Sequence, residues 1–255
     1  MNSRLLLISL ATGLTLCATS VCATEVFQPR KVESDLWQSP HFRRAHPDLK
    51  HRLQGQAHLE DGRAKQAVTE FQQAARWGDK LSQAMLAELY WQGEGVKQDR
   101  ARAYAWMDLA AERQFVAFVA KRERFWSELD ANERERALAI GQELYASMGD
   151  ERALPRLNKH LRKERSSTGS RLGYGGNGSV ILPTAGGGSV DIYARSASGM
   201  LGMVGAAGGR QIPMTAYYAR QYWQTEAYMD WQSDQLELAR RGIVRVGSVE
   251  DSMPD

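Results

Sequence analysis

The feature that most constrains this chain is an internal repeat of 36 residues in its middle region. At that offset Leu49 and Leu53 recur as Met85 and Leu89. A fixed period of about 20 to 50 residues is typical of stacked repeat units, each of which packs on its neighbours. Five further apolar positions recur at the same offset: Ala67, Val68, Phe71, Ala74 and Ala75 become Ala103, Tyr104, Met107, Ala110 and Ala111.

The spacing within each unit predicts two helices joined by a turn. The first helix contributes an apolar pair at i and i+4, and the second has apolar positions at i, i+1, i+4, i+7 and i+8, which lie on one helical face. One such hairpin cannot bury both of its faces, whereas stacked hairpins can. The small alanines allow close helix approach, and Phe71 or Met107 is expected to fill the space between hairpins.

The offset continues with less regularity over residues 115–149, which we interpret as a third, degenerate unit. Leu157 and Leu161 then suit a basic terminal helix that caps the stack. We therefore predict an all-α fold over residues 48–165, a short α-solenoid of about three helical hairpins. The apolar positions of the third unit are Phe125, Ala139, Ile140 and Ala146.

The middle unit carries a longer ordered pattern of glycines, valine, aspartate, tryptophan and paired alanines. Gly93 and Gly95 allow positive φ angles in the loop, and Asp99 is placed to cap the next helix with its carboxylate. This pattern resembles the Sel1-like repeat, a relative of the tetratricopeptide repeat. The residues that carry the resemblance are Leu86, Leu89, Tyr90, Gly93, Gly95, Val96, Asp99, Ala103, Trp106, Ala110 and Ala111.

The resemblance implies a scaffold or adaptor in multiprotein assemblies, including assemblies at bacterial envelopes. The chain departs from the family pattern at two places. Ala87 stands where the family has glycine in the first helix, and Gln114 stands where a glycine usually ends the unit.

The N-terminus has the pattern of a signal peptide over residues 1–23. Arg4 is followed by an uncharged run over residues 5–16, which is too short for a membrane-spanning helix of about 20 residues. Small residues at Val21 and Ala23 predict cleavage between Ala23 and Thr24. We expect a secreted protein, periplasmic in a Gram-negative bacterium, with no transmembrane helix after cleavage.

Removal of this leader changes the chemistry open to the chain. Both cysteines, Cys17 and Cys22, leave with it, so the mature chain has neither a disulfide nor a cysteine-based zinc site. The formal net charge of +3 falls by only one with Arg4, which gives no general affinity for polyanions. We expect a protein partner in the cell envelope and no nucleic acid.

Composition divides the rest of the chain. Residues 24–47 contain three prolines and are predicted to be a loosely ordered leader segment. Residues 166–212 are rich in glycine and predict a linker or a short hairpin, with strands at 180–182 and 190–193. Residues 213–255 predict a C-terminal aromatic helix and a tail.

The aromatic residues of that last helix are candidates for partner binding. They outnumber what one narrow helical stripe would bury, and tyrosine and tryptophan are typical binding anchors. Docking within the molecule explains them equally well, so both alternatives stay open. The residues concerned are Tyr218, Tyr222, Trp223, Tyr228 and Trp231.

No catalytic, cofactor or metal site emerges from the sequence. The five histidines lack the helical spacing of zinc ligands. The glycines of residues 173–178 lack the lysine of a phosphate-binding loop. A basic stretch from Arg152 to Arg171 either contacts an acidic partner or anionic lipid head groups, or is a solvated helix.

The sequence therefore predicts a non-catalytic adaptor that binds another protein by surface complementarity. The alternative is a cell-envelope structural or glycan-associated factor, with aromatic rings stacked on sugars. Neither hypothesis requires a cofactor.

Overall fold

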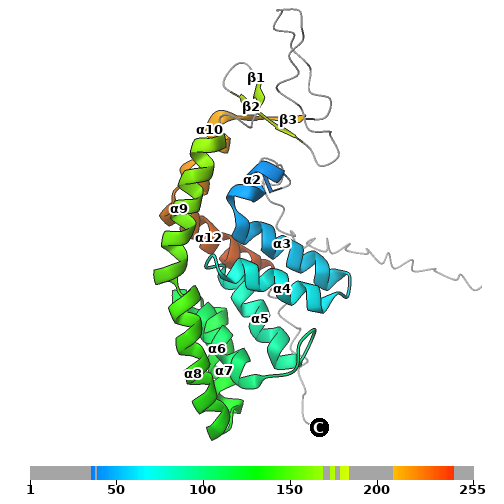
Figure 1. Cartoon of the computed structure of the whole chain (residues 1–255), viewed down its shortest axis with the longest axis vertical. Coiled ribbons are helices and arrows are strands. Elements are labelled where there is room, and N and C mark those ends of the chain that lie inside the picture. Colours follow the sequence, from blue (N-terminus) through cyan, green and yellow to red (C-terminus); the bar gives the residue numbers. More distant parts are fainter. Residues whose placement is uncertain (1–35, 38, 169–172, 176–178, 184–208, 244–255) are drawn as a thin grey trace, which may run out of the picture.

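The computed structural model describes residues 36–37, 39–168, 173–175, 179–183 and 209–243 (Figure 1). The described part is mostly helical, with one small sheet. The predicted signal peptide and its cleavage site lie outside the described residues. The helices before the sheet are α2 (Pro40–Ala45), α3 (Pro47–Glu60), α4 (Ala64–Ala75), α5 (Lys80–Gln92), α6 (Arg100–Ala110), the 3-10 helix η1 (Ala111–Arg113), α7 (Val116–Glu128), α8 (Ala131–Met148) and α9 (Asp150–Thr168).

Two of the expected helical hairpins pack closely, as α3–α4 and α5–α6. The third pair, α7 and α8, is joined in sequence like the others, but both of its helices pack mainly against α6; we still call this pair the third hairpin. Aspartates begin several of these helices as caps. Asp79 accepts a hydrogen bond from the Ser82 amide at 2.9 Å and Asp99 from the Arg102 amide at 3.1 Å. Asp130 forms a reciprocal capping box at the start of α8. The predicted capping role of Asp99 is confirmed.

The core of the stack follows the repeated apolar positions. Phe71, Leu86 and Met107 are buried in one cluster, together with the small alanines of α4 and α6. Gly55 in α3 lets Phe71 lie against the helix backbone, because a Cβ there would come within 2.6 Å of the Phe71 ring. Trp91 stacks on Phe125 with ring centroids 4.0 Å apart, which joins the second hairpin to the third.

The departure at Gln114 has a visible backbone consequence. Gln114 ends η1 in the left-handed region with φ 58°, the conformation that the family's glycine adopts freely. Its side chain donates to the Ala111 carbonyl at 3.3 Å. The turn is therefore kept at the cost of local strain.

After α9 the chain forms a three-stranded antiparallel sheet of order β1-β2-β3. The strands are β1 (Gly173–Gly175), β2 (Ser179–Pro183) and β3 (Gly209–Pro213), with Val180 opposite Ile212. The strand predicted at 180–182 is confirmed within β2. Its partners are β1 and β3, neither of which was predicted, and residues 190–193 lie outside the described part.

The C-terminal segment is broken into α10 (Met214–Tyr217), α11 (Arg220–Trp223) and α12 (Thr225–Ile243). The prediction of one C-terminal helix is wrong for its first part, because the chain turns at Tyr218 and again at Gln224. The long helix begins only at Thr225. These turns bring the aromatic residues against α2, α3 and α9, which form a second core. In Figure 1 α12 lies beside α9 and α3, so the two ends of the described chain meet.

The same core corrects the prediction for residues 24–47. Leu36 and Phe42 are fully buried, and α2 begins at Pro40 with Ser39 as its cap. The proline that suggested disorder is the first residue of a helix, a position that suits it because no amide hydrogen is needed there. A loosely ordered leader is therefore wrong from Leu36 onward.

Candidate functional site

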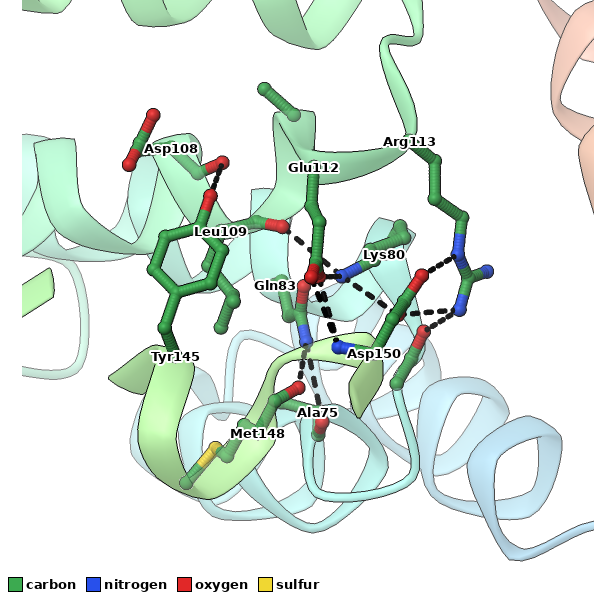
Figure 2. Close-up of polar contacts among 12 residues, drawn as sticks. Ala75, Lys80, Gln83, Asp108, Leu109, Glu112, Arg113, Tyr145, Met148 and Asp150 are labelled. Atoms are coloured by element: carbon green, nitrogen blue, oxygen red, sulfur yellow. Dashed lines mark hydrogen bonds and ion pairs between the residues drawn. The ribbon is translucent and has the colours of Figure 1, made fainter. Parts of the chain in front are cut away.

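A buried ionic cluster locks the second hairpin to its neighbours (Figure 2). We call Lys80, Glu112, Arg113 and Asp150 the repeat junction. The Lys80 side chain is 1% exposed, and its Nζ lies 2.5 Å from Glu112 Oε2 and 3.1 Å from Asp150 Oδ1. It also donates to the Leu109 carbonyl at 3.1 Å. A buried ammonium group with three acceptors is satisfied, so this lysine is structural.

Arg113 completes the repeat junction. Its Nε and Nη2 donate to the two oxygens of Asp150 at 2.7 and 2.9 Å, and Nη2 also donates to the Gly78 carbonyl at 3.1 Å. Burial alone would raise the pKa of Asp150, but its hydrogen bonds to Arg113 and the charges of Arg113 and Lys80 outweigh burial and hold that pKa below its usual value. The junction thus ties the end of α6 to the start of α9.

Neutral groups extend the contact seen in Figure 2. Gln83 Nε2 donates to the carbonyls of Ala75 and Met148, at 3.3 and 3.4 Å. The Tyr145 hydroxyl donates to the Asp108 carbonyl at 3.0 Å. These bonds cross from one hairpin to the next and therefore help to hold the hairpins together.

A second polar cluster joins the two ends of the described chain. We call His46, Asp48, Tyr228 and Gln232 the terminal clasp. Asp48 is 1% exposed, and its Oδ2 accepts from the Tyr228 hydroxyl at 2.8 Å and from Gln232 Nε2 at 2.6 Å. Burial and the Asp48 carboxylate raise the pKa of Tyr228 well above its usual value, so the hydroxyl stays a donor.

His46 is fully buried within this clasp. Its Nδ1 lies 2.9 Å from the Phe42 carbonyl oxygen and its Nε2 lies 2.6 Å from the Tyr222 carbonyl oxygen. Burial lowers the pKa of His46, against the opposing effects of Asp48 and the two carbonyls. The ring stacks on Phe42 with centroids 4.0 Å apart. This histidine therefore holds α11 against α2.

The structure buries most of the predicted partner-binding aromatics. Tyr222, Trp223, Tyr228 and Trp231 all belong to the second core, and Tyr218 is half-buried against it. Trp223 Nε1 donates to the Tyr217 carbonyl at 2.6 Å. Docking within the molecule, the alternative left open by the sequence, is what the structure adopts. An exposed aromatic binding face is wrong for these rings.

The Sel1-like signature residues have structural positions. Leu86, Leu89, Ala103, Trp106, Ala110 and Ala111 are buried, while Tyr90, Val96 and Asp99 are half-buried. Gly93 and Gly95 adopt φ angles of 75° and 72°, as predicted. Gly95 has a further role that the sequence did not reveal, because a Cβ there would lie 2.5 Å from the Ala64 carbonyl carbon of the preceding hairpin.

The described residues contain no group of three or more histidine, cysteine, aspartate and glutamate side chains placed to hold a metal ion. His51 pairs with Glu70 at 2.7 Å, and His160 contacts the Arg44 carbonyl oxygen at 2.9 Å. These histidines have structural partners at separate places. Within the described part, no helix has both the length and the apolar character needed to cross a membrane.

The third hairpin carries large exposed apolar residues, and α9 carries exposed cations. Val116 at the start of α7 is 63% exposed and Leu138 in α8 is 56% exposed. On α9 the exposed residues are mostly cations. We therefore treat the third hairpin and α9, and not the aromatic core, as the candidate contact surfaces.

Stacked hairpins with close alanine contacts define a helical repeat protein of the solenoid class. Residues 80–115, which span α5, α6 and η1, match the Sel1 repeat. The chain therefore contains a Sel1 repeat in its middle hairpin, and such a repeat supports a role of the protein–protein interaction scaffold kind.

A solved structure of a protective antigen present in uropathogenic Escherichia coli strains, which displays an SLR fold, is also similar. The two share 26% sequence identity, with a TM-score of 0.38. The match covers 44% of this chain and 25% of that chain, so the matched part corresponds to about a quarter of the antigen. No curated protein matches the chain.

Proposed function

We propose that this protein is a non-catalytic adaptor that binds another protein in the cell envelope, after secretion into the periplasm of a Gram-negative bacterium. The Sel1 repeat at residues 80–115 supports the scaffold role. The leader pattern of residues 1–23, with cleavage between Ala23 and Thr24, supports secretion.

The observation that carries the proposal is the uncovered face of the third hairpin. Seven residues of α5 are buried, whereas Phe125 is the one buried residue of α7, a helix that lies wholly within the described part. The following helix, α9, does not continue the stack over α7, but contacts α8 and then packs against α2, α11 and α12. The stack therefore ends with an open side.

Exposed apolar side chains on the third hairpin suit a protein partner. Val116 and Leu138 are large, exposed and located on the two helices of the last hairpin. Phe115 and Phe118 pack edge to face beside Val116, with ring centroids 5.6 Å apart. Burying such side chains contributes about 25 cal/mol per Å² of apolar surface removed from water.

The glycan-associated alternative is less well supported. Binding to sugars commonly uses exposed aromatic rings, yet Tyr222, Trp223, Tyr228 and Trp231 are buried in the second core. These four rings therefore cannot form the exposed sugar-binding platform that the glycan hypothesis expects from them.

Photo-cross-linking in cells tests the adaptor role. A photoreactive phenylalanine analogue at Val116 or at Leu138 is expected to give the same discrete protein adduct, since both positions face the partner. The matched control positions are Lys65 and Gln73, which are exposed on α4, far from the open side. Absence of adducts at Val116 and Leu138, or identical adducts at the controls, contradicts the proposal.

Cell fractionation tests the location separately. We expect the protein in the periplasmic fraction, with Thr24 as its first residue by N-terminal sequencing. Retention of Met1 on a cytosolic protein contradicts the secretion proposal and leaves the binding proposal standing.

A further inference from the structure

The exposed side of α9 presents a continuous stripe of cations. Arg152, Arg156, Lys159 and Lys163 are spaced at i, i+4, i+7 and i+11, which places them on one helical face. At 1.5 Å per residue this stripe is about 16 Å long. The opposite face is anchored in the protein by Ala153, Leu157 and Leu161, all fully buried. The stripe is therefore held in place by the fold.

These cations lack the counter-charges that other cations of the molecule have. In the part of the chain that the structure describes, no carboxylate forms an ion pair with Arg152, Lys159 or Lys163. By contrast, Lys121 pairs with Glu88 at 2.7 Å and Arg136 pairs with Asp99 at 3.1 Å.

The helix dipole accounts for only part of this stripe. Cations near a helix C-terminus, such as Lys163, are favoured by the dipole. Arg152 lies in the first turn of α9, where the dipole disfavours a cation. A solvated helix that merely follows its dipole does not explain a stripe that begins at the N-terminal end.

Neighbouring elements widen the positive surface. Arg156 donates to the Arg76 carbonyl in the turn after α4, and His160 contacts the Arg44 carbonyl in α2. Both Arg44 and Arg76 are exposed. Two separate segments thus bring arginines beside the stripe on α9.

We propose that this stripe, which we call the α9 basic stripe (Arg152, Arg156, Lys159 and Lys163), binds an acidic segment of the partner protein. The inference rests on the proposed adaptor function and adds the chemistry of the partner. Complementary charge steers association and selects partners. A cationic row on an anchored helix is matched by carboxylates along a helical or extended acidic segment.

The other polyanions fit this surface less well. A helix that inserts into a membrane surface needs exposed large apolar side chains beside its cations. The exposed large apolar residues of the described part are Val116, Leu138 and Met214, and none of them lies on α9. The rings that would stack on a sugar or a base are buried. An acidic protein segment requires neither feature.

Binding of a dye-labelled polyglutamate peptide, long enough to span the stripe, tests the inference on the full mature chain. We expect salt-sensitive binding that weakens by about tenfold in the double variant Lys159→Glu/Lys163→Glu. The double variant Lys65→Glu/Lys97→Glu is the matched control, since it makes the same charge change at two exposed lysines outside the stripe. It is expected to leave the affinity within about twofold of the parent.

A neutral variant guards against loss of folding. Lys159→Gln/Lys163→Gln avoids placing negative charge in the later turns of α9 and is expected to show an intermediate loss of affinity. Thermal unfolding followed by circular dichroism verifies that each variant is folded. Equal weakening in the stripe and control variants would mean that only total charge matters, which overturns the inference.

Two further probes test whether the stripe binds a different kind of polyanion, a lipid surface or a polysaccharide. If vesicles containing phosphatidylglycerol or soluble dextran sulfate bind through Lys159 and Lys163 while polyglutamate does not, the partner is not an acidic protein segment and the inference fails. The cross-links at Val116 and Leu138 keep the two proposals apart. Their persistence in Lys159→Glu/Lys163→Glu, together with absent peptide binding, would reject the stripe and retain the adaptor.

Discussion

The repeat junction and the terminal clasp are both buried polar clusters, but they join very different parts of the chain. Most contacts of the junction connect residues 32 to 38 positions apart, about one repeat, and the Lys80–Asp150 pair spans about two repeats. The clasp connects residues 176 to 184 positions apart. The junction is a contact between neighbouring units, whereas the clasp closes the chain on itself and pays the larger loop-closure entropy.

The two clusters also differ in how their charges are satisfied. In the junction the carboxylates of Glu112 and Asp150 face the cations Lys80 and Arg113. In the clasp the Asp48 carboxylate is held by the neutral donors of Tyr228 and Gln232, and its Oδ1 has no hydrogen-bond partner among the described residues. We infer that the clasp opens more easily than the stack.

The largest expected effect is on the repeat side of this comparison. Gly95→Ala forces a Cβ to within 2.5 Å of the Ala64 carbonyl carbon at a φ of 72°. We expect a loss of about 3 kcal/mol in the free energy of unfolding, measured in urea. Gly62→Ala is the matched control, with a φ of 71° and open space around it, and should cost only about 1 kcal/mol. Equal losses would show that backbone strain alone matters at Gly95.

Lys80→Met removes the central cation of the repeat junction. We expect a loss of about 3 kcal/mol in the free energy of unfolding, because Glu112 and Asp150 then lie together with one fewer counter-charge. Lys97→Met, at an exposed lysine without an ion pair in the described part, should change stability by less than about 0.5 kcal/mol. If Lys80→Met is as mild as this control, the junction contributes nothing to the stack.

Tyr228→Phe acts on the terminal clasp. Loss of the hydroxyl leaves Asp48 with Gln232 as its remaining donor, so we expect a loss of about 2 kcal/mol. Amide hydrogen exchange should quicken in α12 and stay slow in α5. Tyr218→Phe is the control, since the Tyr218 hydroxyl makes no hydrogen bond within the described structure. Equal acceleration in α5 and α12 would show that the two regions open as one.

A change of pH is expected to have a smaller effect on stability, because it changes the charge of single groups. The pKa of His46 is lowered on folding, so its contribution to stability is fully present above the unfolded value of about 6.5 and is lost as the pH falls below it. The pKa of Asp150 is also lowered, so the junction keeps its contribution until the pH falls below about 3.8.

Acidification from neutral pH to about pH 5 should therefore lower the protection of amides in α11 and α12, measured as exchange relative to the intrinsic rate at each pH, and leave the protection of α5 and α6 unchanged. The variant His46→Gln should remove this pH dependence. Greater protection of α12 at low pH, after correction for the intrinsic exchange rate, would contradict the lowered pKa of His46 and would mean that a charged His46 bridges the Phe42 and Tyr222 carbonyls.

The repeat side of the fold was largely predictable. The 36-residue offset placed α5, α6 and their buried alanines, and the glycines of the loop marked the positive φ angles at Gly93 and Gly95. Local signals suffice here because each unit contacts the next one along the chain. The role of Asp99 as a cap follows from the same local logic.

The candidate surfaces were less predictable. The cationic spacing on α9 is readable in the sequence, but which of these cations form ion pairs in the described part depends on which segments pack beside them. The open side of the third hairpin follows from the path of α9 after α8. The partner-binding prediction for Tyr222, Trp223, Tyr228 and Trp231 failed because a long-range core covers them.

The sequence by itself determined the repeated hairpins, since helix periodicity, caps and loop glycines act within a few residues of one another. Only the tertiary structure decided that residues 36–47 are ordered and that the C-terminal aromatics are internal. Phe42, His46 and Asp48 gain their partners from residues about 180 positions away. No local pattern specifies such a pairing, because its favourable energy exists only after the chain has closed.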